Sequence, residues 1–117
     1  SVVHREIGAS SDSTRMVMGG GWFEAGSTET NYIDYITIAT TGNAQEFGDL
    51  SQIRTYANGL SNSIRGLFGG GADSPVYRNT IDYVTIQSTG NAIDFGDLIQ
   101  QRLGYANAAC DSHGGIS

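Results

Sequence analysis

The segment Ile81–Ile86 reads Ile-Asp-Tyr-Val-Thr-Ile and has a period of two, with Ile81, Tyr83 and Thr85 alternating with Asp82, Val84 and Ile86. A period of two, rather than 3.6, indicates an extended strand that is buried on one or both faces. For this half of the chain the pattern predicts four strands, near residues 55–60, 64–69, 80–87 and 93–98, each close to the usual length of roughly 5–6 residues. Residues 88–92 are expected to form the hairpin turn between the last two strands, because Gly and Asn readily adopt a positive φ.

The pattern occurs twice in the chain. Residues 33–50 and 81–98 are identical at 13 of 18 positions, at an offset of 48 residues. Ahead of each copy, Arg15–Gly21 (RMVMGGG) matches Arg65–Gly71 (RGLFGGG), and both glycine runs are expected to end a second strand. Self-similarity at this period predicts a repeat protein, with one unit at 5–53, a second at 54–101 and the first half of a third at 102–117. The first strand of the first unit is expected near residues 6–9.

Composition narrows the possible functions. Gly supplies 17 residues, Pro one, and Tyr and Phe six and four, which favours short strands joined by tight turns. A net charge of −6 disfavours a nucleic-acid partner, since phosphates would be repelled. Lysine is absent, which excludes Schiff-base and Walker-type lysine chemistry. Cys110 is the only cysteine, so no internal disulfide forms, and without an apolar run of 18 residues no membrane insertion is expected.

The elements of each unit resemble the kelch-type β-propeller blade. The resemblance rests on an Arg that opens the first strand, a glycine run that ends the second, Tyr35 or Tyr83 in the third and Phe47 or Phe95 in the fourth. It implies an all-β fold: a kelch-like β-propeller segment made of four-stranded antiparallel blades. The strings RGLFGGG, IDYVTI, STGNA and DFGDL also resemble repeats in kelch-like virion and tail-fibre proteins of cyanobacterial and marine phages.

The resemblance implies a non-catalytic structural or host-surface adhesion scaffold, located in a virion or extracellularly. The alternative is a carbohydrate-binding, lectin-like propeller. Because propellers typically have 4–8 blades, two and a half units cannot close a ring. The expected partners are therefore further blades of a longer chain, which the surplus half unit favours, or other copies of the protein. Host-surface glycans and virion proteins are further candidate partners.

The candidate binding residues lie where the two copies differ. The segment that joins the second strand to the third is Trp22–Tyr32 in one unit and the shorter Ala72–Asn79 in the other. Recognition usually resides on loops while a scaffold repeats. Exposed aromatic and arginine side chains are common binding anchors, so the candidates are Trp22, Phe23, Tyr32, Tyr77 and Arg78.

Other chemistry-bearing residues are expected to be structural. The acids recur once per unit beside repeated arginines, which favours ion pairs or turn capping over calcium binding or catalysis, although calcium stays open; they are Asp34/Asp82, Glu46/Asp94 and Asp49/Asp97. The recurring Tyr and Phe are expected to pack between blades. Asp94-Phe95-Gly96 spells a kinase motif without a lysine, and two histidines and one cysteine are too few for a kelch-type copper radical oxidase. No cofactor and no enzymatic activity are expected.

Overall fold

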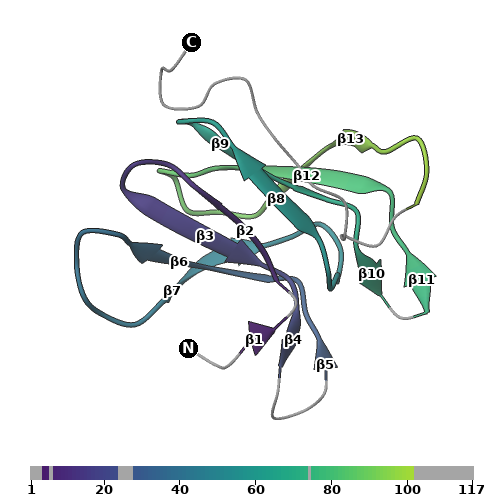
Figure 1. Ribbon diagram of the computed structural model, residues 1–117, viewed down its shortest axis with the longest axis horizontal. Helices are drawn as coiled ribbons and strands as arrows, with labels where there is room; N and C mark the ends of the chain where they lie inside the picture. The colour runs from purple at the N-terminus through teal and green to yellow at the C-terminus, as the bar shows by residue number, and fades with distance from the viewer. Residues whose placement is uncertain (1–3, 6, 24–27, 74, 102–117) are drawn as a thin grey trace.

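The computed structural model describes residues 4–5, 7–23, 28–73 and 75–101 (Figure 1). All regular elements in this part of the chain are β-strands, and all paired strands run antiparallel. The all-β prediction is therefore confirmed. His113, Cys110 and Arg102, with the rest of the expected third unit, lie outside the described residues.

Each repeat forms one four-stranded sheet whose strands follow chain order. The first sheet has the order β2-β3-β6-β7, with β2 (Gly8–Ser11), β3 (Arg15–Gly19), β6 (Tyr32–Thr37) and β7 (Gln45–Asp49). The second has the order β8-β9-β12-β13, with β8 (Asn58–Ser61), β9 (Arg65–Gly69), β12 (Thr80–Thr85) and β13 (Ile93–Asp97). The four predicted strands are confirmed to within a few residues, and β2, the first strand of the first sheet, starts slightly later than expected.

The glycine runs end β3 and β9, as predicted, and the structure shows why glycine is needed. Gly20 and Gly21 have φ values of 73° and 95°, which L-residues with a side chain rarely adopt. A Cβ on Gly20 would also overlap the carbonyl oxygen of Arg54. That carbonyl accepts a hydrogen bond of 2.8 Å from the Gly21 amide. The glycine run therefore binds the segment that leads into the second repeat.

The segments after the glycine runs, which the sequence predicted to be loops, form small hairpins. β4 (Trp22–Phe23) pairs with β5 (Thr28–Glu29) and with β1 (His4–Arg5), and β10 (Ala72–Asp73) pairs with β11 (Val76–Tyr77). The pairing satisfies backbone groups that a loop would leave to water. Both hairpins extend from the sheets toward the lower part of Figure 1.

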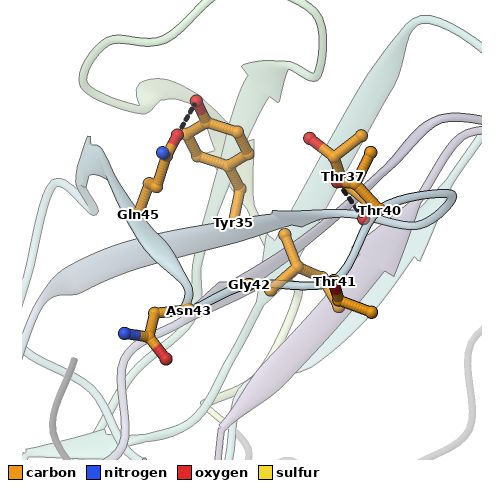
Figure 2. A pocket seen from close by; sticks show the side chains of 8 residues that line it. Tyr35, Thr37, Thr40, Thr41, Gly42, Asn43 and Gln45 are labelled. Atoms are coloured by element: carbon orange, nitrogen blue, oxygen red, sulfur yellow. Dashed lines mark hydrogen bonds between the residues drawn. The ribbon is translucent and has the colours of Figure 1, made fainter.

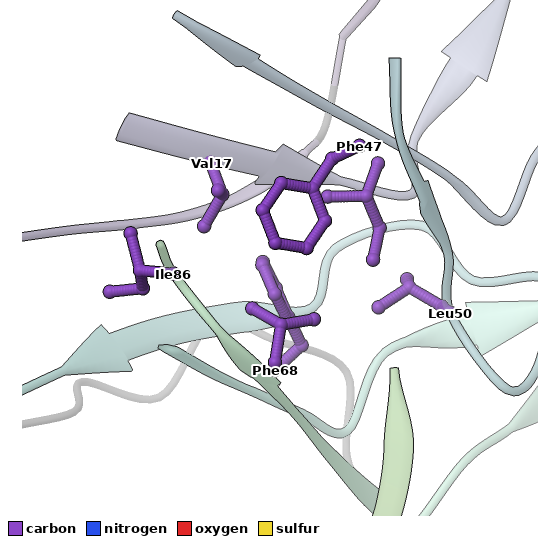
Figure 3. Close-up of a cluster of buried hydrophobic side chains, with 7 residues drawn as sticks. Val17, Phe47, Leu50, Phe68 and Ile86 are labelled. Carbon is purple, nitrogen blue, oxygen red and sulfur yellow. The ribbon is translucent and has the colours of Figure 1, made fainter. Parts of the chain in front are cut away.

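The hydrophobic core lies between the two sheets (Figure 3). The first repeat contributes one group of apolar residues and the second contributes another; they are Val17, Ile33, Phe47 and Leu50 from the first, and Phe68, Val84 and Ile86 from the second. All seven are buried, and Tyr35 packs against them. The core is therefore the interface between successive repeats.

One core prediction is wrong for the second repeat. Phe47 is 3% exposed between the sheets, whereas Phe95, at the same position of the repeat, is 56% exposed. Phe95 lies on β13, an edge strand. Phe47 faces a neighbouring sheet, and among the described residues Phe95 has no corresponding sheet over it. The repeat thus has a phenylalanine at this position in both copies, and its burial depends on whether a neighbouring sheet covers it.

This matched pair predicts unequal effects of the same substitution. Phe47→Ala should lower the free energy of unfolding by about 3–5 kcal/mol, because it removes a buried aromatic ring and leaves a cavity. Phe95→Ala should lower it by less than about 1 kcal/mol, because water already covers much of that ring. Urea denaturation in dilute solution measures both values, and equal losses would contradict the assigned core.

Candidate functional site

The same three side chains form a stack in each repeat. The Arg15 guanidinium lies 4.5 Å above the centre of the Tyr35 ring, and Tyr35 meets Phe47 edge-on at 5.9 Å between ring centres. In the second repeat, the corresponding distances are 4.5 Å and 6.0 Å. The second stack consists of Arg65, Tyr83 and Phe95. Cation–π and edge-to-face contacts favour this arrangement, so the repeated residues act first within their own sheet.

The stack of the first repeat is also the contact surface for the second. Arg15 donates a hydrogen bond of 3.3 Å to the carbonyl oxygen of Ile86, and Phe47 is buried against the second sheet. We call this side of a repeat its C-terminal face; in the first repeat it comprises Val17, Ile33, Phe47 and Leu50. The N-terminal face is the opposite side; in the second repeat it comprises Phe68, Val84 and Ile86.

A turn of the second repeat holds the edge strand of the first. The amides of Gly90 and Ala92 donate hydrogen bonds of 2.8 Å and 2.7 Å to the carbonyl oxygens of Phe47 and Asp49. The Asn91 side-chain oxygen accepts a hydrogen bond of 3.1 Å from the amide of Asp49. The turn Gly90–Ala92 therefore partly caps β7, which is otherwise the open edge of its sheet.

Polar side chains also connect the two repeats away from the turn Gly90–Ala92. The Gln87 amide nitrogen donates to the Asp12 carboxylate at 2.5 Å and also contacts the Thr14 hydroxyl. The Ser61 hydroxyl donates to the carbonyl oxygen of Ser11 at 2.5 Å and accepts from its amide at 3.2 Å. The interface is thus fixed in register by hydrogen bonds on both sides of the apolar core.

A buried ion pair ties the connector between the repeats to the second sheet. Arg54 and Asp82 are fully buried, and their side chains meet at 2.8 Å. Arg54 also donates to the carbonyl oxygens of Gly70 and Thr80 at 3.1 Å and 2.7 Å, and Asp82 accepts from the amide and hydroxyl of Ser51. Burial lowers the pKa of Arg54, and the Asp82 carboxylate opposes that effect. The predicted structural role of a repeated acid is confirmed at Asp82.

A small hollow lies beside the turn of the first repeat (Figure 2). It is about 150 Å³ in volume and is lined by residues 35–37, 40–43 and 45. The corresponding hollow of the second repeat has one additional wall, the Phe47 ring from the first repeat. Ligand pockets usually measure roughly 300–1,000 Å³, so the position and size of the hollow suit a protein side chain better than a metabolite.

The predicted binding residues lie on or beside the two hairpins. Trp22 and Phe23 form β4, Tyr77 lies on β11, and Tyr32 opens β6. Tyr32 and Tyr77 are 49% and 50% exposed. Arg78 forms a part-exposed ion pair of 2.9 Å with Asp73, within its own hairpin. The structure thus places the candidates on or beside the corresponding hairpins of two units rather than in one pocket, and their role in binding stays a prediction.

The contact that the turn Gly90–Ala92 makes between the repeats was not predicted from the sequence. The string Thr-Gly-Asn-Ala occurs unchanged at 41–44 and 89–92, and it was interpreted as a hairpin signal and as part of the resemblance to phage repeats. A turn tolerates Gly, Asn, Asp or Ser at several positions, so full identity of the string carried an additional signal. That signal was contact with a neighbouring repeat.

No family model matches the chain, and no curated protein is significantly similar to it. Within the described residues, no group of three or more His, Cys, Asp or Glu side chains is placed to hold a metal ion. The same part of the chain contains no helix long and apolar enough to cross a membrane.

The lowered pKa of Asp12 should make the stability of the fold depend on pH. Partial desolvation raises the pKa of this carboxyl, but hydrogen bonds from Gln87, Arg15 and Thr14 outweigh that effect and lower the pKa from 3.8 to about 2. A folded-state pKa below the unfolded value stabilises the fold above about pH 4, and this contribution is lost as the pH falls toward 2. Since solvent screens this carboxylate, we expect the contribution to be about 0.5–1 kcal/mol.

Asp12→Asn tests this expectation, because the second repeat already has Asn62 at the same turn position. Asn62 accepts hydrogen bonds of 2.8 Å from the amides of Ile64 and Arg65, so the variant turn should form normally. Between pH 4 and 2 the unfolding free energy of the variant should decline less than that of the native chain, by the contribution of Asp12, about 0.5–1 kcal/mol. Gln87→Ala should reduce the decline without removing it. Identical pH profiles for all three chains would contradict the assignment.

Proposed function

We propose that the chain is part of a kelch-like β-propeller that serves as a non-catalytic scaffold of a phage-type virion or tail fibre, where it contacts the host surface or neighbouring virion proteins. Propellers arrange four-stranded sheets radially, with the first strands innermost. Two contacts support such an arrangement: β2 lies against β8 and β9, and the outer strand β7 meets the turn of the next repeat.

The proposal rests mainly on one observation: residues that recur in both repeats form the contact between the repeats. Arg15, Tyr35 and Phe47 recur as Arg65, Tyr83 and Phe95 with the same geometry, and in the first repeat they build the contact with its neighbour. Residues repeated in each unit therefore support packing, and the hairpins carry the differences. This division suits a rigid scaffold that presents variable loops.

Fractionation of phage particles tests the proposed location. An antibody raised against the 117-residue chain should detect the natural protein in density-purified particles from an infected source culture. In electron micrographs, the label should lie on the tail or its fibres. Signal confined to the particle-free lysate, with none in purified particles, would overturn the virion assignment.

The exposed hairpin aromatics favour one alternative function, carbohydrate binding. Tyr32 and Tyr77 are about half exposed, and Trp22 is half-buried on β4. Aromatic rings offer apolar faces with a polar edge, which suits a sugar ring on a shallow surface. In this form of the scaffold, each hairpin would contribute one side of a glycan site.

A glycan array distinguishes this alternative. Binding of the native chain to a defined glycan class, reduced at least about tenfold by Trp22→Ala or Tyr77→Ala, would support a lectin-like function. Ile64→Ala, which truncates another exposed apolar residue, serves as the control. The absence of any signal on the array would exclude carbohydrate binding and leave the structural scaffold.

A further inference from the structure

The two outer faces of the described molecule repeat the two halves of its core. On the C-terminal face of the second repeat, four residues correspond in sequence to the buried group Val17, Ile33, Phe47 and Leu50; they are Leu67, Ile81, Phe95 and Leu98. On the N-terminal face of the first repeat, Met18, Ile36 and Ile38 correspond to the buried Phe68, Val84 and Ile86. All seven outer residues are less buried than their counterparts.

The clearest contrast on the N-terminal faces involves two isoleucines. Ile86 is fully buried against the first sheet, and Ile38, at the same position of the first repeat, is 52% exposed. Together with Phe47 and Phe95, this pair shows that each outer face presents one half of an interface whose complete form exists inside the same chain. The missing half of each face is present on the opposite side of the molecule.

The hydrogen-bonding parts of the interface are repeated as well. β13 is an edge strand with the same Phe-Gly-Asp sequence as β7, and Gly42–Ala44 has the same sequence as the turn Gly90–Ala92. A Cβ on Gly48 would overlap the backbone of Gly90, so this contact requires glycine. Gly96 occupies the same position on β13, although a Cβ there would meet no atom within 4 Å. The close-approach site is present and open.

We propose that the C-terminal face of the second repeat binds the N-terminal face of the first repeat in a second copy of this chain. Phe95 would then pack against the hollow beside Gly42, as Phe47 packs beside Gly90, and the turn Gly42–Ala44 would cap β13. The inference deepens the scaffold function proposed above and rests on it, because it names the partner through which the scaffold extends. The internal interface is its template.

Two differences limit how closely the contact between copies follows that template. A Cβ on Gly59 would overlap the carbonyl oxygen of Ala9, and one on Gly66 would overlap the Ser10 hydroxyl. In the first repeat, the corresponding positions hold Ala9 and Met16. We therefore expect the copies to separate slightly at the inner strands and to contact each other mainly through β13, Phe95 and the turn. The contact should be weaker than the one within a chain.

The proposed contact is heterologous, since each copy contributes a different face. Such contacts continue from copy to copy until they close a ring or form an open filament. Closure at the usual 4–8 sheets would need about two to four copies if each copy contributes its two described four-stranded sheets. The mass in solution should therefore rise with concentration, in multiples of 12.4 kDa.

Analytical ultracentrifugation of the whole 117-residue chain, between about 1 and 200 µM, tests the proposal. The native chain should associate as its concentration rises. Phe95→Asp and Ile38→Asp should each weaken association at least about tenfold, because each places a charge in one of the two faces. Val76→Asp, which adds the same charge to an exposed residue of a hairpin, should associate like the native chain. Both target residues are more than half exposed, so urea denaturation should show that each variant is folded.

Mixing the two variants gives the decisive result. The Phe95→Asp chain retains an intact N-terminal face and the Ile38→Asp chain retains an intact C-terminal face, so a mixture should form one-to-one dimers that grow no further. A native chain that stays monomeric throughout the range, or a mixture that stays monomeric, would overturn the proposal. Detection of the protein in virions is a separate readout, so failure here would leave the proposed location standing.

Discussion

The structure depends on one constraint: each sheet has two apolar faces, and a single repeat can bury neither of them. Val17 and Phe47 become core only because the second sheet covers them, and Phe68 and Ile86 only because the first does. A four-stranded sheet with a hydrophobic face needs such packing to be stable. Stability in a protein of this kind is therefore set by contacts between neighbouring repeats, as expected where each unit touches mainly the next one. The same constraint leaves an apolar face at each side of the described molecule.

Hydrogen bonds and a buried ion pair fix the two sheets in one relative position. Apolar packing alone would tolerate a sliding or rotation of the two sheets, because it has little directionality. The turn Gly90–Ala92 fixes β7 through backbone hydrogen bonds, and the Arg54–Asp82 pair fixes the connector. Loss of one partner from a buried ion pair typically destabilises a protein by about 3–5 kcal/mol, because the other charge is left unpaired. Arg54 therefore favours one path for the chain between repeats.

The sequence predicted the elements of this fold better than their environment. The period-two pattern located the four strands of the second four-stranded sheet, and the internal repeat indicated an equivalent set of four in the first unit. The hairpins were missed because strands of two residues carry no periodicity. The exposure of Phe95 could not be predicted, since Phe47 and Phe95 lie in nearly the same local sequence and differ only in what faces them. The contact of Asn91 with the neighbouring repeat was missed because the turn string was interpreted within its own hairpin, although its identity in both copies carried an additional signal.

The hairpins and the interface place different demands on the sequence, and this difference explains how the two copies have diverged. Arg5 pairs with Trp22 in the first unit, and Thr55 pairs with Ala72 in the second. The two pairs have the same register, although the amino acids differ at both positions. Backbone pairing holds each hairpin on its sheet, so its side chains are not needed to maintain the contact between repeats. The turn is different, because Gly90 and Asn91 contact the neighbouring sheet directly. Sequence variation can therefore accumulate on the hairpins without weakening the interface that makes each sheet stable.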